Sequence, residues 1–506
     1  MTTVKGSRRL FGYSGKDVVL SLQHMFAMLG ATITVPIVSG MSIPLALISA
    51  GVGTIIFYFC TQRKVPVFLG SSFAFLPPLA AMISGYGDGP LSYDSRSLAV
   101  MLALVCAGFV YVILAIVIKA VGVQRIKKLF PPIVVGPVII VIGMNLAGTA
   151  FTSNIFQATA APWQAWTTAI VTALTIVLVN SLAKPKSFLK IVPVLLGFVV
   201  GYAYAAILSV CPTPAGYAPL IDFKNIFSGD VVVFQQAKEI WGFWAAWDEL
   251  DMAFLGSAML AIVPLAIVTF MEHLGDISAN SVVCGKDFMV DPGLHRTVLG
   301  DGLATMASAM LGGPANTTYG ENTAVLAITK NYSPRNLFLA ACFAVVLGLF
   351  VPFGEILESI PGPVVGGASL ILYGMIAANG LRALVDGRVD FSDMKNMIVV
   401  SLTLSVGLGL NMASMAGYGI SIGDVTISAL AIATLLSILL NLIMPNTKEV
   451  TPEKKKAMEE APISLVSHEA DIEEAAAEGA AEAGAGASDT GDFPENESDP
   501  KEKKEE

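Results

Sequence analysis

The sequence has little charge and few of the motifs by which enzymes and metal proteins are recognised. Only 14% of its 506 residues are Asp, Glu, Lys or Arg, whereas a soluble domain carries about 25%. Its five cysteines are scattered without metal-ligand spacing, and its four histidines form no HExxH motif. It also lacks a phosphate loop, a cofactor motif and a nucleophile–base pair. These absences argue against an enzyme and predict no cofactor and no metal.

The sequence is instead rich in apolar residues. They make up 54% of the chain, and the mean hydropathy is +0.70. The first apolar run lacks a small-residue cleavage site and leads into further runs, which argues against a cleavable signal peptide. The composition therefore predicts a multi-pass protein of the cell membrane whose surroundings are the lipid bilayer.

Charge is concentrated at the end of the chain. Residues 448–506 contain 18 acidic and 7 basic residues, which leaves 21 acidic and 23 basic residues in the remainder. The segment 446–506 is rich in Glu, Ala and Gly and nearly free of aromatic residues, a composition typical of disorder. We expect a disordered acidic tail, and no nucleic-acid partner for the chain.

Apolar runs of the length that crosses a bilayer, about 20 residues, recur along residues 18–445. Lys and Arg gather in alternate loops between them, which places both termini in the cytoplasm, including residues 1–17. We therefore expect an all-α protein with fourteen spans, near 18–38, 44–61, 67–84, 97–119, 130–150, 165–183, 190–210, 253–273, 297–313, 319–331, 335–353, 361–380, 395–412 and 424–444.

The chain also repeats itself weakly. Residues 132–136 (PIVVG) recur at 362–366 (GPVVG), and 71–74 (SSFA) resemble 317–320 (TTYG). Taken in sequence order, these matches pair the fifth expected span with the twelfth and the third with the tenth. Because seven is odd, the halves are expected to be inverted in the membrane. Inverted repeats with paired broken helices are typical of secondary transporters.

Two carboxylates inside apolar stretches mark the expected site. A charged residue at membrane depth costs about 2.5–3.5 kcal/mol on insertion scales and usually serves a function. Glu272 ends the eighth span, with Asp276 one helical turn later, and Glu321 lies in the tenth. The alternative for Glu272 and Asp276 is a charge at the membrane boundary, and for Glu321 a helix cap.

The third and tenth spans are interrupted by glycine and proline. We expect a short extended piece in each, followed in the tenth by a half-helix from about Glu321 whose free N–H groups can bind carbonyl oxygens. Phe73 and Tyr319 lie in these pieces, and Tyr373 lies in the twelfth span. Carboxylates, backbone N–H groups and aromatic rings together suit a planar heterocycle with alternating N–H and C=O groups. Each tyrosine can equally be a packing residue.

These segments resemble the uracil permeases of the nucleobase–ascorbate transporter (nucleobase:cation symporter) family. The resemblance covers about residues 15–445. It rests on the segments NTTYGEN (316–322), EHLG (272–275), GSSFAF (70–75) and DPGLHR (291–296).

The resemblance implies fourteen spans in two inverted repeats. A core, about 18–120 and 253–354, would move against a gate, about 129–211 and 360–445. It also implies a site in which the glutamates bind uracil and the gate supplies one tyrosine. The implied substrate-binding residues are Glu272, Glu321, Phe73, Gly320, Tyr319 and Tyr373.

The implied activity is uracil import by proton symport, with Glu272 and Asp276 in proton coupling. Some uracil permeases have His where Asp276 stands, so sodium coupling stays open. A purine (xanthine or guanine) permease is the alternative substrate class, although those members typically have Gln in place of Glu321. An anion exchanger would need a cationic residue in the broken spans, and a channel fits inverted halves less well. A homodimer is left open.

Overall fold

The computed structural model describes residues 13–84, 91–156, 158–184, 187–212, 215–223, 235–422, 425–426 and 428–444. Contacts divide the chain into one unit at Met1–Pro445 and a second at Asn446–Glu506. The second unit, which includes the expected acidic tail, lies outside the described residues. The same holds for most of the expected N-terminal segment.

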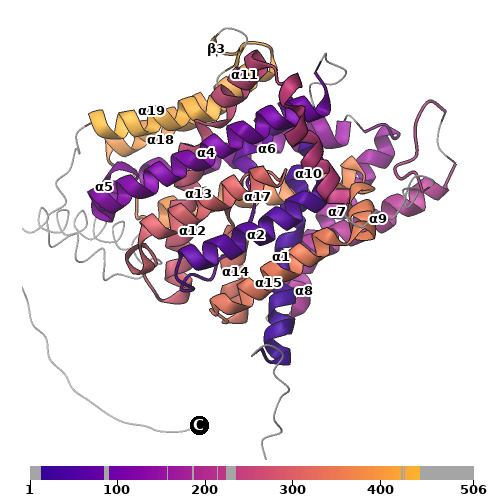
Figure 1. The fold of residues 1–506 in the computed structure, drawn as a ribbon, viewed down its shortest axis with the longest axis horizontal. Helices are drawn as coiled ribbons and strands as arrows, with labels where there is room; N and C mark the ends of the chain where they lie inside the picture. The colour runs from indigo at the N-terminus through magenta and orange to yellow at the C-terminus, as the bar shows by residue number, and fades with distance from the viewer. Residues whose placement is uncertain are drawn as a thin grey trace, which may run out of the picture. The chain divides into compact units, whose positions relative to one another are not determined.

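The described chain is almost entirely helical (Figure 1). Several helices begin with proline in their first or second position, where its missing N–H costs nothing. The elements of the first half are α1 (Gly15–Ser39), α2 (Ile43–Cys60), β1 (Leu69–Ser71), η1 (Phe73–Phe75), α3 (Leu76–Met82), α4 (Tyr93–Val121), α5 (Val123–Leu129), α6 (Pro132–Thr149), η2 (Ala150–Phe156), α7 (Pro162–Leu182), α8 (Phe188–Ile191) and α9 (Pro193–Val210).

The second half follows a similar order of elements. They are α10 (Gln235–Ala245), η3 (Ala246–Glu249), α11 (Met252–Ile262), α12 (Leu265–Cys284), η4 (Met289–Gly293), α13 (Leu294–Met310), β2 (Asn316–Thr318), α14 (Gly320–Thr329), α15 (Pro334–Leu349), α16 (Val351–Glu358), α17 (Gly362–Asp386), α18 (Met394–Met415), β3 (Ser421–Ile422), β4 (Val425–Thr426) and α19 (Ala429–Ile443).

Nine helical segments in the described ranges are long and apolar enough to cross a membrane. Residues on their outer faces, such as Ile116, Ile170 and Val199, are apolar and more than half exposed, as expected of side chains that contact lipid. The chain is therefore a multi-pass membrane protein by fold. Each of the fourteen expected spans overlaps at least one helix, but fourteen crossings stay a prediction.

One helix extends beyond the span expected for it. The eighth span was expected to end near residue 273, but the apolar segment Met252–Cys284 continues past it. Pro264 divides this segment into α11 and α12. Hydropathy falls after Glu272 because polar residues follow, yet the helix continues because those residues are packed against other elements. Glu272 consequently lies within α12 rather than at its end.

Packing brings elements from the two halves together. In the first set of contacts, α13 lies against α4 and α2, and α15 against α2. In the second, α6 lies against α17 and α18, and α7 against α9 and α17 (Figure 1). Fully buried side chains such as Phe57, Leu104 and Val298 form the interior of the first set. Helix α12 also contacts α6, and helix α1 also contacts α17, so both α12 and α1 pack against helices of the second set.

Candidate functional site

The two broken segments meet as a two-stranded antiparallel sheet. Leu69 pairs with Thr318, and Ser71 pairs with Asn316. Each strand leads into a short helix, and the α14 helix begins at Gly320. Its N-cap residue, Tyr319, is extended and makes no side-chain capping bond, and the N–H of Asn322 donates within the first turn to the Tyr319 carbonyl. The positive end of the helix dipole therefore lies at Gly320. The expectation of an extended piece followed by a half-helix is confirmed.

The sheet depends on a close approach that only glycine allows. A Cβ atom on Gly70 would lie 2.4 Å from Cε2 of Tyr319 and 2.8 Å from Oγ1 of Thr32. The Tyr319 hydroxyl donates a hydrogen bond of 2.8 Å to the carbonyl of Ser71. This hydroxyl is therefore tied to backbone, and the ring is the part of Tyr319 that remains for packing.

Three aromatic rings gather at the end of β1. The centroids of Phe73 and Tyr319 are 6.3 Å apart, with the planes inclined at 24°. Tyr373, from α17, meets Phe73 edge-on at 5.7 Å. All three side chains are buried. The structure thus brings together the three aromatic residues expected at the site, although they lie in segments more than 50 residues apart.

The acidic residues of α12 lie beside this cluster. The helix packs against η1, β2 and α14, and both Glu272 and Asp276 are partly buried. The Thr318 hydroxyl donates a 2.9 Å hydrogen bond to Oδ2 of Asp276, so this carboxylate is joined directly to β2. Glu321 is the second residue of α14, but its side chain lies outside the part of the structure that is described.

Two buried amides hold the segment before β1. Asn280 of α12 and Asn322 of α14 both donate through Nδ2 to the carbonyl of Pro66, at 3.1 Å and 3.0 Å. Both side chains are buried. One carbonyl thereby links the two helices that carry the proposed carboxylates. Asn322 belongs to the quoted segment 316–322, but its structural role was not foreseen.

A buried histidine–aspartate pair was also missed. Nδ1 of His273 lies 3.3 Å from Oδ2 of Asp301, and neither side chain is exposed. A carboxylate removed from water costs several kcal/mol unless it is paired, and His273 of α12 is the side chain that lies beside the Asp301 carboxylate of α13. The signal was present, because Asp301 lies in the apolar ninth span just as Glu272 lies near the eighth.

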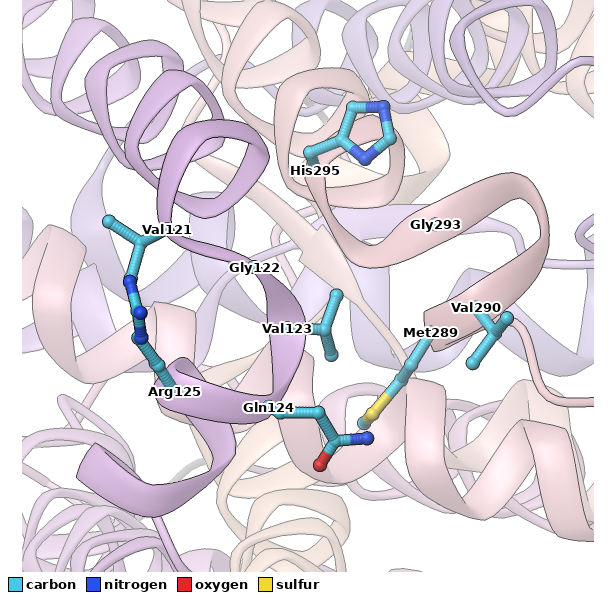
Figure 2. Close-up of a pocket in the computed structure, with 9 residues that line it drawn as sticks. All are labelled: Val121, Gly122, Val123, Gln124, Arg125, Met289, Val290, Gly293 and His295. Carbon is cyan, nitrogen blue, oxygen red and sulfur yellow. The ribbon is translucent and has the colours of Figure 1, made fainter.

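A separate cavity lies at the junction of α4 and α5. Its volume is about 500 Å³, and Figure 2 shows lining residues from this junction, from η4 and from the start of α13. The lining includes the aliphatic Val121 and Val123 together with Arg125 and His295. None of the expected site residues lines it, so it is distinct from the aromatic and acidic cluster.

Comparison with known proteins places this arrangement in a family. Residues 15–416 match the model of the Permease family. The chain belongs to the Permease family. This permease is 39% identical over 444 residues to a uracil permease of Bacillus caldolyticus, covering 85% of the chain and 92% of the relative. It is 32% identical over 456 residues to a uracil permease of Escherichia coli strain K12, covering 88% and 97%. The resemblance inferred from the four quoted segments is confirmed.

Solved structures share the fold of the permease at low sequence identity. The transmembrane domain of a cyanobacterial bicarbonate transporter, BicA, has a TM-score of 0.52 at 14% identity and covers 84% of this chain and 96% of that one. A murine anion transporter, Slc26a9, in the inward-facing state has a TM-score of 0.57 at 10% identity, covering 87% and 69%. At these identities the likeness concerns the fold alone.

Proposed function

We propose that this permease imports uracil by proton symport with alternating access. The observation that carries the proposal is the β1–β2 pair, which puts Phe73, Tyr319 and the start of α14 beside the acidic face of α12. Relatives named as uracil permeases, aligned over most of the chain, support the pyrimidine as substrate.

Each group at the site has a role toward a pyrimidine. The carboxylates of Glu272 and Glu321 accept hydrogen bonds from ring N–H groups. The N–H groups at the start of α14, from Gly320 onward, donate to a ring carbonyl. Phe73 and Tyr319 offer apolar faces to the flat ring, and Tyr373 approaches from α17. Backbone at Phe73 completes the site.

Proton coupling is assigned to the two acids of α12. Glu272 and Asp276 are one helical turn apart, and two acids in a poorly solvated site resist ionising together, so at least one holds a proton more tightly. The hydrogen bond from Thr318 to Asp276 ties this acid to β2. Binding of the base and of the proton would then be linked through one helix.

Transport is proposed to move the gate, about 129–211 and 360–445, against the core, about 18–120 and 253–354. Substrate contacts then belong mainly to the core, while the gate contributes Tyr373. The distribution of Lys and Arg in the loops supports a cytoplasmic location for both termini.

The test is uptake of radiolabelled uracil by purified protein in liposomes, with proton and sodium gradients imposed separately. Accumulation driven by the proton gradient alone is the expected result. Accumulation driven only by sodium would show that sodium, not the proton, is the coupling ion. Preferential accumulation of xanthine or guanine would show that the substrate is a purine. The Glu272→Gln variant is the matched control for the role of the Glu272 carboxylate, because it keeps the side-chain shape and removes the charge.

A further inference from the structure

The helix α17 reaches the site at a second point beyond Tyr373. Six residues later on the same helix, the side chain of Asn379 lies over the start of α14. A Cβ atom built on Gly320 would be 2.8 Å from Nδ2 of Asn379 and 3.7 Å from its Cγ. Because Gly320 has no side chain, the amide can approach the backbone at the point where α14 begins.

The same point is close to the acidic face of α12. The Cβ position on Gly320 is 3.3 Å from Oδ1 of Asp276, while Oδ2 of that carboxylate accepts from Thr318. The Asn379 amide and the Asp276 carboxylate therefore flank Gly320 from two helices. An amide that carries both donors and an acceptor can interact there with a carboxylate, with backbone N–H groups or with a polar ligand.

Contacts of α17 thus lie on both ends of the two-stranded sheet. Tyr373 touches Phe73, which follows β1, and Asn379 touches Gly320, which follows β2. The two strands are antiparallel, so these residues mark opposite ends of the pair. Asn379 is exposed, unlike Tyr373, and its contact can be made or broken without uncovering a buried polar group.

We propose that Asn379 is a positioning residue of the transport cycle, whose amide closes α17 onto the Gly320–Asp276 side of the site and must withdraw when α17 moves. The inference rests on the proposed alternating-access uptake of uracil. It assigns a polar gate contact in addition to the aromatic one at Tyr373.

The first experiment is a double-mutant cycle. An alanine at position 320 pushes the exposed Asn379 amide out of its place beside Gly320, and Asn379→Ala removes that amide, so each single variant is expected to lower the uracil uptake rate by about tenfold. Because both changes remove the same contact, the Gly320→Ala/Asn379→Ala variant is expected to lose no more uptake than either single variant. Gly374→Ala is the matched control on α17, since its Cβ would meet nothing within 4 Å, and it is expected to keep wild-type uptake.

Two results of this cycle would overturn the inference. One is a Gly320→Ala variant with wild-type uptake. The other is a double variant whose loss equals the product of the single losses, because independent sites combine in that way. Protein yield and thermal midpoint of every variant separate misfolding from a defect in transport.

The second experiment replaces Asn379 together with Gly320, so the amide no longer crowds the side chain introduced at position 320. Cysteines at positions 320 and 379, in a chain whose five natural cysteines are replaced, are joined in liposomes with a short bis-methanethiosulfonate linker, which forms a disulfide with each thiolate and releases methanesulfinate. We expect linkage to form without substrate, to stop uptake, and to be reversed by reductant. Absence of linkage, or continued uptake by the linked protein, would refute the role of Asn379. A wild-type protein that imports no uracil would instead refute the proposed function, and the two failures are therefore distinct.

Discussion

Gly70→Ala tests whether the two broken segments meet as the structure describes. The new methyl group would lie 2.4 Å from Cε2 and 2.6 Å from Cζ of Tyr319, and 2.8 Å from Oγ1 of Thr32. Neither neighbour moves freely. Tyr319 is held by its hydrogen bond to the Ser71 carbonyl, and the Thr32 hydroxyl donates to the carbonyl of Met28.

The magnitude follows from overpacking in a closely packed interior. Inserting a methyl group there typically costs about 1–3 kcal/mol, and at Gly70 the strain falls on β1 and on the Tyr319 ring. We expect the free energy of unfolding to fall by that amount. The ring offered to the substrate is also displaced, so the KM for uracil should rise.

The assay combines reversible unfolding in detergent with uracil uptake in liposomes. Gly374→Ala provides the matched control, because the same methyl group enters open space there and should change neither quantity. If Gly70→Ala had wild-type stability and wild-type KM, the close packing of β1 on Tyr319 would be refuted. If Gly70→Ala lost stability but kept its KM for uracil, the proposed contact between the Tyr319 ring and the substrate would be refuted.

Three further predictions concern single side chains. Tyr319→Phe removes the hydrogen bond to Ser71 and should lower the free energy of unfolding by about 0.5–1.5 kcal/mol, while uracil affinity in a binding assay stays unchanged; weakened binding would give the hydroxyl a substrate role. Glu321→Gln replaces an acceptor oxygen by a donor group and should weaken uracil binding by roughly 1.5–3 kcal/mol; wild-type affinity would remove this glutamate from the site, and a gain of xanthine binding would support the assignment. Asp276→Asn keeps an oxygen that can accept from Thr318 but removes the charge, so it should flatten the dependence of uptake on external pH and spare most equilibrium binding. An unchanged pH profile with proton-driven uptake would leave Glu272 as the carrier.

The sequence alone determined the class of the protein and singled out the segments of the proposed site. Apolar runs must form membrane spans, because backbone polar groups need internal hydrogen bonds in lipid. Glycine and proline in the third and tenth spans had to interrupt those helices. A carboxylate in an apolar stretch is costly enough to single out Glu272 without any coordinates.

Helix ends and short helices were less accessible from the sequence. Helix α12 runs beyond the expected eighth span, and hydropathy cannot foresee that Asn280 will be buried against the Pro66 carbonyl, which is 214 residues away. Short helices such as α5 and α8 are shorter than a membrane span, so a search for apolar runs of about 20 residues does not find them.

Only the tertiary structure decided which residues meet. The pairing of Ser71 with Asn316, the burial of His273 against Asp301 and the position of Asn379 over Gly320 all join distant segments. Such contacts depend on how helices pack, which a local pattern of apolar residues does not encode. Periodicity and composition specify which faces of the elements are buried, whereas the packed fold specifies the partner that each buried polar group obtains.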